Sequence, residues 1–507
     1  MRLDAWVVPS FPDVFFVACL ALALVTGSRM VNGDGDPARH LTVGGYILSS
    51  GHVPTDNVFS YTRAGEPLLP YEWLARVAAA ASHRLAGLGG VVLLHGLAIG
   101  LAFVVVLRHI VARGQSARLA RWVVAFAIVT STVHWIARPH VFTYLGLAVF
   151  AAVLDGWYAG RISSRVLWLL PLGMVLWVNL HGGFFIGILL LGSYVLADFL
   201  RLTFADGPAM SETRRRLRVL IPVSFAAILA TIVNPAGLGM LTHGPGLLGQ
   251  RLVIDRTVEF RSPDFHQAAL IPFLAMLLGT MLVTAWSRWR PTIQEGLLLA
   301  VFTALSFYSG RNIPLFAIVV APLLASALSS MPLPNGGLFA AGRPLGQCLT
   351  HATAGPHEPP LERRGHLWPM AAAAVLFVIG AVQAKEGEAT LGVDFDPSLQ
   401  PVAAASYLKG HQPLGNGFNE LIWGGYLLHE LWPVDRVFID GQTDFYGEAI
   451  FRDYLDVADL QENWQEVLDR YGVRWFIYET GSPVTRALKN AGWHVAYEDP
   501  MATVLTR

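Results

Sequence analysis

The stretch GGVVLLHGLAIGLAFVVVL, residues 89–107, decides the class of the fold because it is a long apolar run in which His95 is the only strongly polar side chain. A helix rises about 1.5 Å per residue, so roughly 20 such residues cross the apolar core of a bilayer. Of all 507 residues, 54% are hydrophobic and 14% are charged. These fractions exclude ordinary soluble domains and predict that most of the chain lies in a membrane.

Apolar runs of this kind recur along the chain and predict about eleven membrane spans. They are residues 12–30, 89–107, 122–137, 141–158, 166–180, 183–200, 219–239, 268–286, 294–310, 313–330 and 367–384. The first run also has features of a cleavable secretory signal, but the spans that follow favour an uncleaved anchor.

The arginines in the short loops predict the orientation, since basic residues in such loops stay on the cytoplasmic side. They follow the second, fourth, sixth and eighth runs, and Arg343, Arg363 and Arg364 follow the tenth. Arg2 precedes the first run. We therefore expect a multi-pass protein of the bacterial inner membrane, with a cytoplasmic N-terminus and a C-terminal region outside.

Charge and motif content exclude two other classes of function. The net formal charge is zero and the pI is about 7.3, so the concentrated basic surface of a nucleic-acid-binding protein is not expected. The chain has no Walker motif and no strand-flanked G-x-G-x-x-G, so ATP is not an expected partner.

A long outer loop, residues 31–88, joins the first two spans and carries Asp34, Asp36, His40 and Glu72. Pro37 predicts the start of a short helix with Asp36 as its N-cap. Paired carboxylates can act as a general base or can hold a divalent cation such as Mg²⁺ or Mn²⁺. They can equally be turn and capping residues, and the loop by itself leaves these alternatives open.

Further polar side chains occupy turns on the same outer side. Three hairpins have short helices, about 15 or 16 apolar residues each, so their turns are expected to lie below the membrane surface. Polar groups at that depth are costly unless they line a cavity, although each could also be a helix-end residue that reaches the headgroups. Arginine suits the binding of a lipid phosphate. The residues concerned are Arg138 and His140 in ARPHVF, His181 in NLHGGF, Arg311 in SGRNIPL, and Arg261 in the loop segment VEFRSPDFHQ.

The composition changes after residue 384, and residues 385–507 predict a small soluble α/β domain. RVFID, VRWFIYE, WHVAYE and ATVLT are expected strands, while PVAAASYLKG, NWQEVLDRYG and VTRALKNAG are expected helices. Trp423, Tyr426 and Asp440 surround one predicted strand end. They suit sugar or peptide binding, but core packing of the two rings and a turn at Asp440 is the favoured interpretation.

Several of these motifs together resemble the GT-C superfamily of membrane glycosyltransferases, in particular the bacterial branch similar to dolichyl-phosphate-mannose-protein mannosyltransferases. The resemblance covers most of the chain. It is carried by DGDPARHLTVGGYI, VPTDNVFSYT, YEWL, RPHVFTYL, NLHGGFFIG, SPDFH and RNIPLFAIVVAP in this order. Family members usually have aromatic residues before the histidine of the first motif, whereas Pro37, Ala38 and Arg39 stand here.

The resemblance implies a helical membrane domain, residues 1–384, that transfers a sugar from a polyprenyl-phosphate donor to a glycan, lipid or protein acceptor at the outer face. Asp36 would be the catalytic base of an inverting reaction and Asp34 its partner, orienting the acceptor or holding a cation. The donor phosphate would contact Arg138, His181, Arg261 and Arg311. His40, Glu72, His140, Trp423, Tyr426 and Asp440 would bind or orient the acceptor.

A second interpretation also fits the pattern of outer polar residues. The chain could be a non-catalytic subunit that binds lipid-linked glycans, or helps to export them, for a polysaccharide assembly system. A transporter would lead us to expect internal repeats, and none is evident in the sequence.

Overall fold

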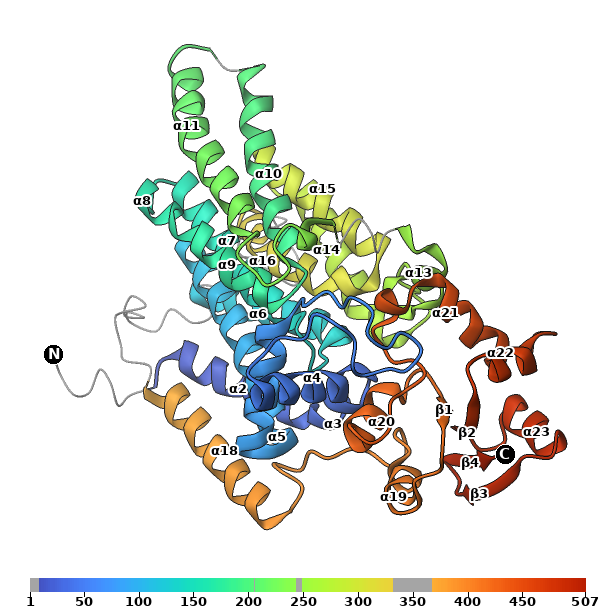
Figure 1. Cartoon of the computed structure of the whole chain (residues 1–507). Helices are drawn as coiled ribbons and strands as arrows, with labels where there is room; N and C mark the ends of the chain where they lie inside the picture. Colours follow the sequence, from blue (N-terminus) through green and yellow to red (C-terminus); the bar gives the residue numbers. More distant parts are fainter. Residues whose placement is uncertain (1–8, 205, 243–248, 332–366) are drawn as a thin grey trace.

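The computed structural model describes residues 9–204, 206–242, 249–331 and 367–507, and most of this chain is helical (Figure 1). The predicted cytoplasmic loop with Arg343, Arg363 and Arg364, like Arg2, lies outside the described residues. A helix occupies each of the eleven predicted runs. These helices are α2 (Phe11–Val25), α5 (Trp73–Ala112), α6 (Ala117–Ser131), α7 (Val141–Tyr158), α9 (Leu169–Leu180), α10 (Phe184–Leu202), α11 (Gly207–Ala230), α14 (Ile271–Trp286), α15 (Ile293–Tyr308), α16 (Ile313–Ser329) and α18 (Leu367–Glu386).

Six helices in the described ranges are long and apolar enough to cross a membrane, namely α5, α7, α10, α14, α16 and α18. The predicted class, a polytopic helical membrane protein, is therefore confirmed. The helices that flank the three outer turns differ in length more than expected, from 12 residues in α9 to 19 residues in α10.

The two most buried helices organise the bundle. α5 packs against α2, α7 and α18, while α16 packs against α6, α14 and α15. α5 changes direction at Ala86 and Gly87, where the backbone leaves helical geometry. Gly87 has a φ of 58°, and a Cβ there would lie 2.5 Å from the Thr390 side chain, so glycine suits this bend.

Short helices fill the connections on the outer side. α3 (Gly27–Asn32) and α4 (Asp36–Ser50) follow α2, and α4 lies along the first part of α5. The predicted helix at Pro37 is confirmed, but the predicted N-cap is wrong: Gly35 precedes the helix and Asp36 is its first residue. The other connecting helices are α8 (Ser164–Leu167), α13 (Arg251–Arg256), η1 (Thr132–His134), η2 (Val258–Phe260), η3 (Ala268–Leu270) and η4 (Gly310–Asn312).

A four-stranded sheet of order β1-β2-β4-β3 forms the centre of the C-terminal region. β1 (Asn416–Asn419) is parallel to β2 (Val473–Glu479), whereas β4 (Ala502–Thr506) is antiparallel to both β2 and β3 (His494–Glu498). Its helices are α19 (Val402–His411), α20 (Gly424–Leu431), α21 (Thr443–Ala458), α22 (Trp464–Arg470) and α23 (Pro483–Asn490). The predicted α/β character, three of the four strands and all three helices are confirmed.

The predicted strand RVFID is wrong, and β1 was not predicted. Within the described chain, residues 436–440 lie outside the four-stranded sheet, and Val437 forms an isolated parallel bridge with Ser60 of the outer loop. The apolar side chains of Phe438 and Ile439 are nevertheless fully buried. The run of apolar residues from Val437 to Ile439 therefore reflects packing rather than a sheet ladder.

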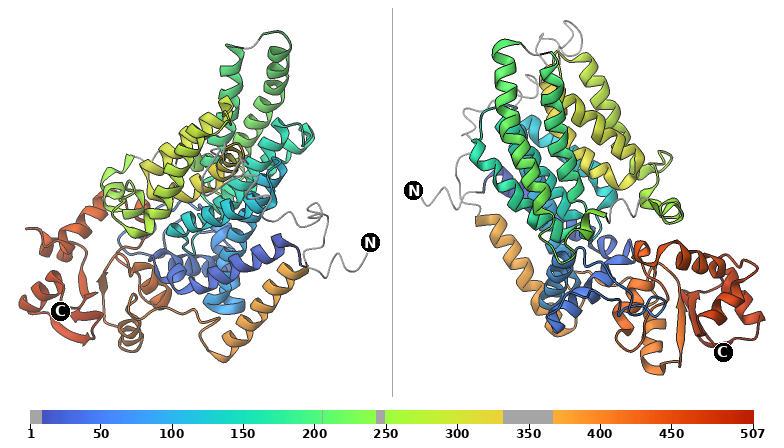
Figure 2. Two further views of the ribbon diagram at one scale, coloured as in Figure 1. Left: turned by 180° about the vertical axis from the view of Figure 1, so that it is seen from behind. Right: turned by 45° about the horizontal axis from the view of Figure 1, so that its top comes forward.

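The C-terminal region and the turn between α10 and α11 lie at opposite ends of the molecule (Figures 1 and 2). α20 packs against α4, so the C-terminal region contacts the outer loop directly. Glycines permit the close approach: a Cβ at Gly425 would lie 2.0 Å from the Gly35 carbonyl oxygen. The outer loop is thereby held between the helical bundle and the C-terminal region.

Candidate active site

Five charged side chains from four outer segments gather around Arg138 and Glu259, and we call this group the Arg138 cluster: Asp34, Asp36, Arg138, Glu259 and Arg311. One guanidinium nitrogen of Arg138, Nη1, lies 2.5 Å from Asp34 Oδ2 and 3.2 Å from Glu259 Oε2. The other, Nη2, lies 2.7 Å from Asp36 Oδ2. Arg311 Nη1 lies 3.7 Å from Glu259 Oε1. The five side chains are between 10% and 25% exposed, so the cluster is largely buried but still partly accessible to solvent.

Local backbone geometry fixes the two aspartates. Asp34 Oδ1 accepts a hydrogen bond of 3.0 Å from the Asp36 N–H, which closes a turn just before α4. Asp36 then starts α4 with Pro37 beside it. A helix N-terminus favours a negative charge, so this position stabilises the Asp36 carboxylate.

The charge balance of the cluster is uneven, since three carboxylates surround two guanidinium groups. Burial, together with the negative charges of Asp34 and Glu259, raises the pKa of Asp36 to about 7 although Arg138 opposes the shift. Burial also disfavours the charged form of Glu259, but Arg138 and Arg311 outweigh it and lower the pKa of Glu259 to about 2. Asp36 is therefore the carboxylate that exchanges a proton near neutral pH.

The two oxygens of Asp36 have different surroundings. Oδ2 contacts Arg138, whereas Oδ1 is buried and has no hydrogen-bond partner among the described residues. Gly441 of the C-terminal region packs against Oδ1 so closely that a Cβ at position 441 would lie 1.8 Å from it. An oxygen held in this way has a free lone pair and a fixed position.

A second polar group, formed by Glu72, His181 and Arg76, adjoins the Arg138 cluster. His181 Nε2 lies 3.4 Å from Glu72 Oε1, and Arg76 Nη2 lies 3.8 Å from Glu72 Oε2. His181 Nδ1 accepts a hydrogen bond of 2.9 Å from the Gly183 N–H, so the ring proton is on Nε2 and points to Glu72. Burial lowers the pKa of His181 well below its usual value, which keeps this ring neutral.

The remaining predicted histidines are buried beside these groups. His140 Nε2 donates a hydrogen bond of 3.0 Å to the His134 carbonyl oxygen, and its ring lies 6.3 Å from that of His181. Both ring nitrogens of His40 are buried without a hydrogen-bond partner among the described residues. Burial and nearby Arg76 lower the pKa of His40 well below its usual value.

The other predicted residues make their described side-chain contacts outside the Arg138 cluster, although Asp440 directly precedes Gly441, which packs against Asp36. Arg261 is an outlying residue: its Nε donates a hydrogen bond of 2.9 Å to the Asp255 carbonyl oxygen in an exposed contact. Trp423 and Tyr426 are both 3% exposed and belong to the apolar core of the C-terminal region, so no ring face is presented for a sugar. Asp440 is fully buried and pairs with Arg39 Nε at 2.9 Å.

Sequence reasoning missed Glu259, which contacts Arg138, Arg311 and His134 at 3.2 to 3.7 Å. It lies in the segment VEFRSPDFHQ, from which Arg261 was predicted as a site residue and Glu259 was not. An acidic residue between the apolar residues Val258 and Phe260 is the local signal for a buried carboxylate. Arg39 was noted only as a departure from the family motif, yet it connects α4 to Asp440.

The donor set does not fit a bound metal ion in this arrangement. Arg138 takes the position between the Asp34 and Asp36 carboxylates where a cation would be held. No group of three or more His, Cys, Asp or Glu side chains within the described ranges is arranged around a common point. We therefore derive no step through a metal ion and assign the local positive charge to Arg138 and Arg311.

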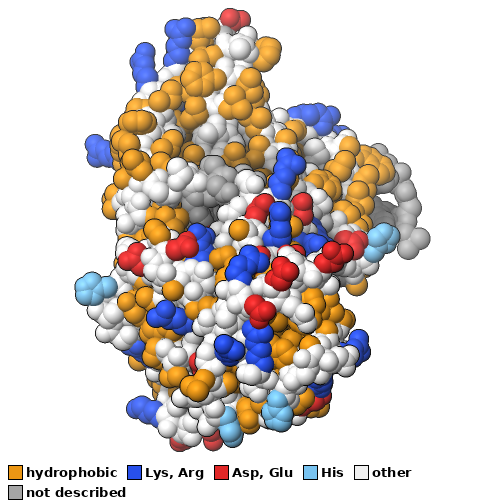
Figure 3. Space-filling model, turned by 45° about the vertical axis from the view of Figure 1, so that its right-hand side comes forward, with side chains coloured by type: hydrophobic (Ala, Val, Ile, Leu, Met, Phe, Trp, Pro, Cys, Tyr) orange, Lys and Arg blue, Asp and Glu red, His pale blue; other side chains and the backbone are white. Residues whose placement is uncertain are grey.

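On the face drawn in Figure 3, charged side chains of both signs gather across the middle of the molecule. Hydrophobic side chains predominate above this band, toward the end formed by α10 and α11. Such a division is typical of a membrane protein whose polar region meets the apolar bundle at the membrane surface.

Known structures share this fold at low sequence identity. The oligosaccharyltransferase of Archaeoglobus fulgidus in its apo form aligns with a TM-score of 0.55 at 13% identity, covering 92% of this chain and 69% of that protein. The same enzyme, AglB, with an inhibitory peptide and a dolichol-phosphate gives 0.55 at 12% identity, covering 93% and 70%. ArnT from Cupriavidus metallidurans in the apo state gives 0.53 at 15% identity, covering 97% of both chains.

No model of a protein family matches the chain, and no curated protein matches it in sequence. The structural likeness therefore shows the fold of the GT-C transferases, a polytopic membrane bundle with a C-terminal region. It extends over the whole length of ArnT. The mannosyltransferase-like branch stays a prediction, as do the roles of the individual residues.

Proposed function

We propose that this chain is an inverting membrane glycosyltransferase that moves a sugar from a polyprenyl-phosphate donor to an acceptor hydroxyl at the Arg138 cluster. The main support for this proposal is Asp36. Its pKa is near neutrality, and its buried oxygen Oδ1, which has no hydrogen-bond partner among the described residues, can accept a proton. Structures of the same fold include transferases, and one of them holds a dolichol-phosphate. We place residues 1–384 in the inner membrane and residues 385–507 outside it, with the N-terminus in the cytoplasm.

The proposed reaction is a single displacement. The acceptor oxygen forms a bond to the anomeric carbon of the sugar while its proton passes to Asp36. The bond between the anomeric carbon and the phosphate oxygen breaks on the opposite side, and polyprenyl phosphate leaves with the electron pair. One displacement inverts the configuration of the anomeric carbon.

The leaving phosphate requires positive charge at the moment when the bond breaks. Arg311 is suited to this task because its only described carboxylate contact is the one with Glu259, at 3.7 Å, which leaves other N–H groups available to a phosphate oxygen. Arg138 is engaged by three carboxylates, so its first role is to orient Asp34 and Asp36. Glu72 orients His181, whose neutral ring adds a polar contact beside the donor.

The test replaces Asp36 by Asn and measures transfer of labelled sugar from a panel of synthetic polyprenyl-phosphate sugars in membranes that contain the full chain. General-base catalysis contributes about 10²- to 10⁴-fold, so we expect a loss of at least about 100-fold. Asp264→Asn is the matched control, since Asp264 is an exposed outer carboxylate whose Oδ1 accepts a hydrogen bond from the His266 N–H. Equal transfer by the two variants would exclude Asp36 as the base and favour the interpretation as a glycan-binding subunit.

A further inference from the structure

A polar cavity of about 470 Å³ lies at the end of the helical bundle opposite the Arg138 cluster. α7 and α16 begin beside Arg138 and Arg311, respectively, and end at this cavity. The 18 residues of α7 span about 27 Å, so the two sites are separate. By the arginine pattern of the loops, this end is predicted to face the cytoplasm.

Four arginine side chains line the cavity, three from helix ends and Arg216 from within α11, but not all are equally available to a ligand. Arg113 is engaged by Asp155, Glu295 and the Ser326 hydroxyl. Arg161 pairs with Asp155 at 2.7 Å and is the most exposed of the four. These contacts brace the ends of α5, α7, α15 and α16 against one another and form one wall of the cavity.

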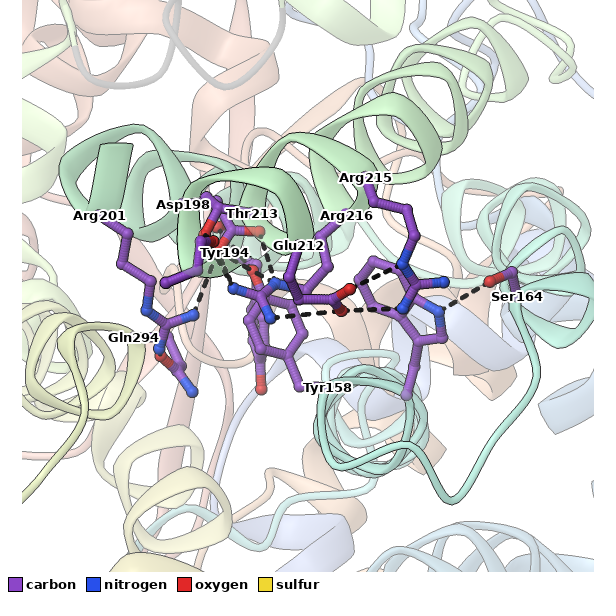
Figure 4. Close-up of polar contacts among 12 residues, drawn as sticks. Tyr158, Ser164, Tyr194, Asp198, Arg201, Glu212, Thr213, Arg215, Arg216 and Gln294 are labelled. Carbon is purple, nitrogen blue, oxygen red and sulfur yellow. Dashed lines mark hydrogen bonds and ion pairs between the residues drawn. The ribbon is translucent and has the colours of Figure 1, made fainter. Parts of the chain in front are cut away.

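Arg201 of α10 and Arg216 of α11 form the opposite wall and share a single carboxylate (Figure 4). Asp198 is fully buried, and it lies 3.1 Å from Arg201 Nη1 and 3.2 Å from Arg216 Nε. Both guanidinium groups also lie over the ring of Tyr158, 5.7 Å and 5.0 Å from its centroid. Two cations around one buried anion leave an excess of positive charge at this wall.

The nearby carboxylate of Glu212 is engaged elsewhere. Arg215 Nε and Nη2 each donate a hydrogen bond of 2.8 Å to Glu212, whereas Arg216 Nη1 is 3.7 Å from it. Figure 4 shows Glu212 between these two arginines. The excess charge of the Arg201 and Arg216 pair is therefore only weakly offset by Glu212.

A second cavity of about 420 Å³ adjoins the same two arginines on the other side. Its remaining walls include the apolar side chains of Phe204, Ala209 and Ile293. Phe204 is 83% exposed, as expected of a side chain that contacts lipid. A polar cavity and a more apolar one thus meet at a positively charged boundary.

We propose that the Arg201 and Arg216 pair binds the phosphate of a membrane lipid in the leaflet opposite the candidate active site. Planar guanidinium groups bind phosphate oxygens through parallel charge-assisted hydrogen bonds. The rest of the headgroup occupies the polar cavity near Arg113 and Arg161. One acyl chain follows Phe204, Ala209 and Ile293 toward the bilayer. The inference does not depend on the proposed transferase activity.

The test purifies the full chain from membranes and exposes it to phosphatidylglycerol in detergent, with native mass spectrometry counting the retained lipids. We expect the double variant Arg201→Gln/Arg216→Gln to retain at least about tenfold less lipid than the wild-type chain. The double variant Arg214→Gln/Arg218→Gln is the matched control, because it removes two positive charges from the same helix at exposed residues that line neither cavity. Equal retention by the double variant and the control would overturn the proposal.

The Arg201→Gln/Arg216→Gln variant leaves the buried Asp198 carboxylate without its two counter-ions, which destabilises the fold. A second variant therefore keeps every charge in place. Ala209→Phe fills part of the apolar cavity, and we expect it to reduce retention of phosphatidylglycerol while thermal stability is kept. Inorganic phosphate is the remaining arm of the test. If phosphate binds at Arg201 and Arg216 while no lipid is retained by the wild-type chain, the site takes a soluble anion and the lipid assignment is wrong.

Discussion

Removing Arg39 is expected to destabilise the contact between α4 and the C-terminal region. Arg39 Nε and Asp440 Oδ2 are 2.9 Å apart, and the two side chains are 2% and 0% exposed. In Arg39→Met the Asp440 carboxylate keeps its hydrogen bond from the Gln442 N–H but loses its buried counter-ion. Breaking a buried pair in this way costs about 3–5 kcal/mol, because one charge is left uncompensated.

A double-mutant cycle separates this cost from ordinary packing. Asp440→Leu leaves Arg39 unpaired and should cost a similar amount, about 3–5 kcal/mol. Arg39→Met/Asp440→Leu removes both charges, and the aromatic ring of Phe59, 5.9 Å from Arg39 Cζ, offers an apolar neighbour to the new methionine. We expect the double variant to be more stable than either single variant.

Thermal unfolding in detergent, followed by tryptophan fluorescence, measures the effect, since Trp423 and Trp475 are buried in the same region. At about 2–4 °C per kcal/mol, each single variant should lower the midpoint by roughly 6–20 °C. The exposed pair of Arg256 and Asp459, 3.7 Å apart, is the control, and Arg256→Met should shift the midpoint little. A double variant whose loss equals the sum of the single losses would refute the coupling.

Four further predictions concern the Arg138 cluster. Gly441→Ala should reduce sugar transfer by roughly 100-fold, because a Cβ 1.8 Å from Asp36 Oδ1 must displace the carboxylate by about 1 Å. The transfer rate should rise with pH through about pH 7 as Asp36 loses its proton, and Glu259→Gln should move this rise to lower pH by removing a negative charge. The pKa of Asp36 is higher in the folded than in the unfolded chain, so Asp36 contributes to the free energy of unfolding below about pH 4 and loses this contribution as the pH rises to about 7. Asp36→Asn should remove this dependence of the free energy of unfolding on pH. Arg311→Gln should lower transfer at least about tenfold through loss of phosphate stabilisation.

Gly441→Ala and Arg311→Gln each have a counterpart that makes the same substitution elsewhere. Gly410→Ala adds a methyl group with no atom within 4 Å, so it should leave transfer unchanged. Arg261→Gln removes an exposed outer arginine whose side chain donates a hydrogen bond to the Asp255 carbonyl oxygen, and its effect should be small. Transfer measured across a pH series with the labelled donor panel compares each variant with its counterpart. An equal loss in Arg311→Gln and Arg261→Gln would contradict a specific role for Arg311.

The membrane fold was predictable because lipid imposes a strong local rule on sequence. Each span must satisfy its own backbone hydrogen bonds as a helix and must be apolar over most of its length. Such a run can be recognised without knowing its neighbours. The clustering of Arg138 and Arg311 with the outer aspartates followed from the same topology, since alternate turns must lie on the same side.

The errors arise where distant segments decide the outcome. β1 is a four-residue strand with the polar sequence NGFN, and it exists because it pairs with β2 more than 50 residues later. The segment RVFID has the composition of a strand, yet its three apolar residues are buried without joining the sheet, and Val437 forms only an isolated bridge with Ser60 of the outer loop. Trp423 and Tyr426 likewise have sequence features that fit either binding or packing, and only their neighbours show that they are core residues.

Glu259 shows how the same limitation applies to chemistry. Its isolated position in a loop gives no reason to pair it with Arg138, which lies 121 residues earlier in the chain. Once the two are brought together, the cluster has one carboxylate more than it has guanidinium groups, and the excess charge is relieved by the raised pKa of Asp36. The raised pKa that makes Asp36 a candidate base depends on more than the motif around it. Its largest cause is burial, to which Gly441 of the C-terminal region contributes, and the negative charges of Asp34 in the same motif and of Glu259 in a distant segment raise it further.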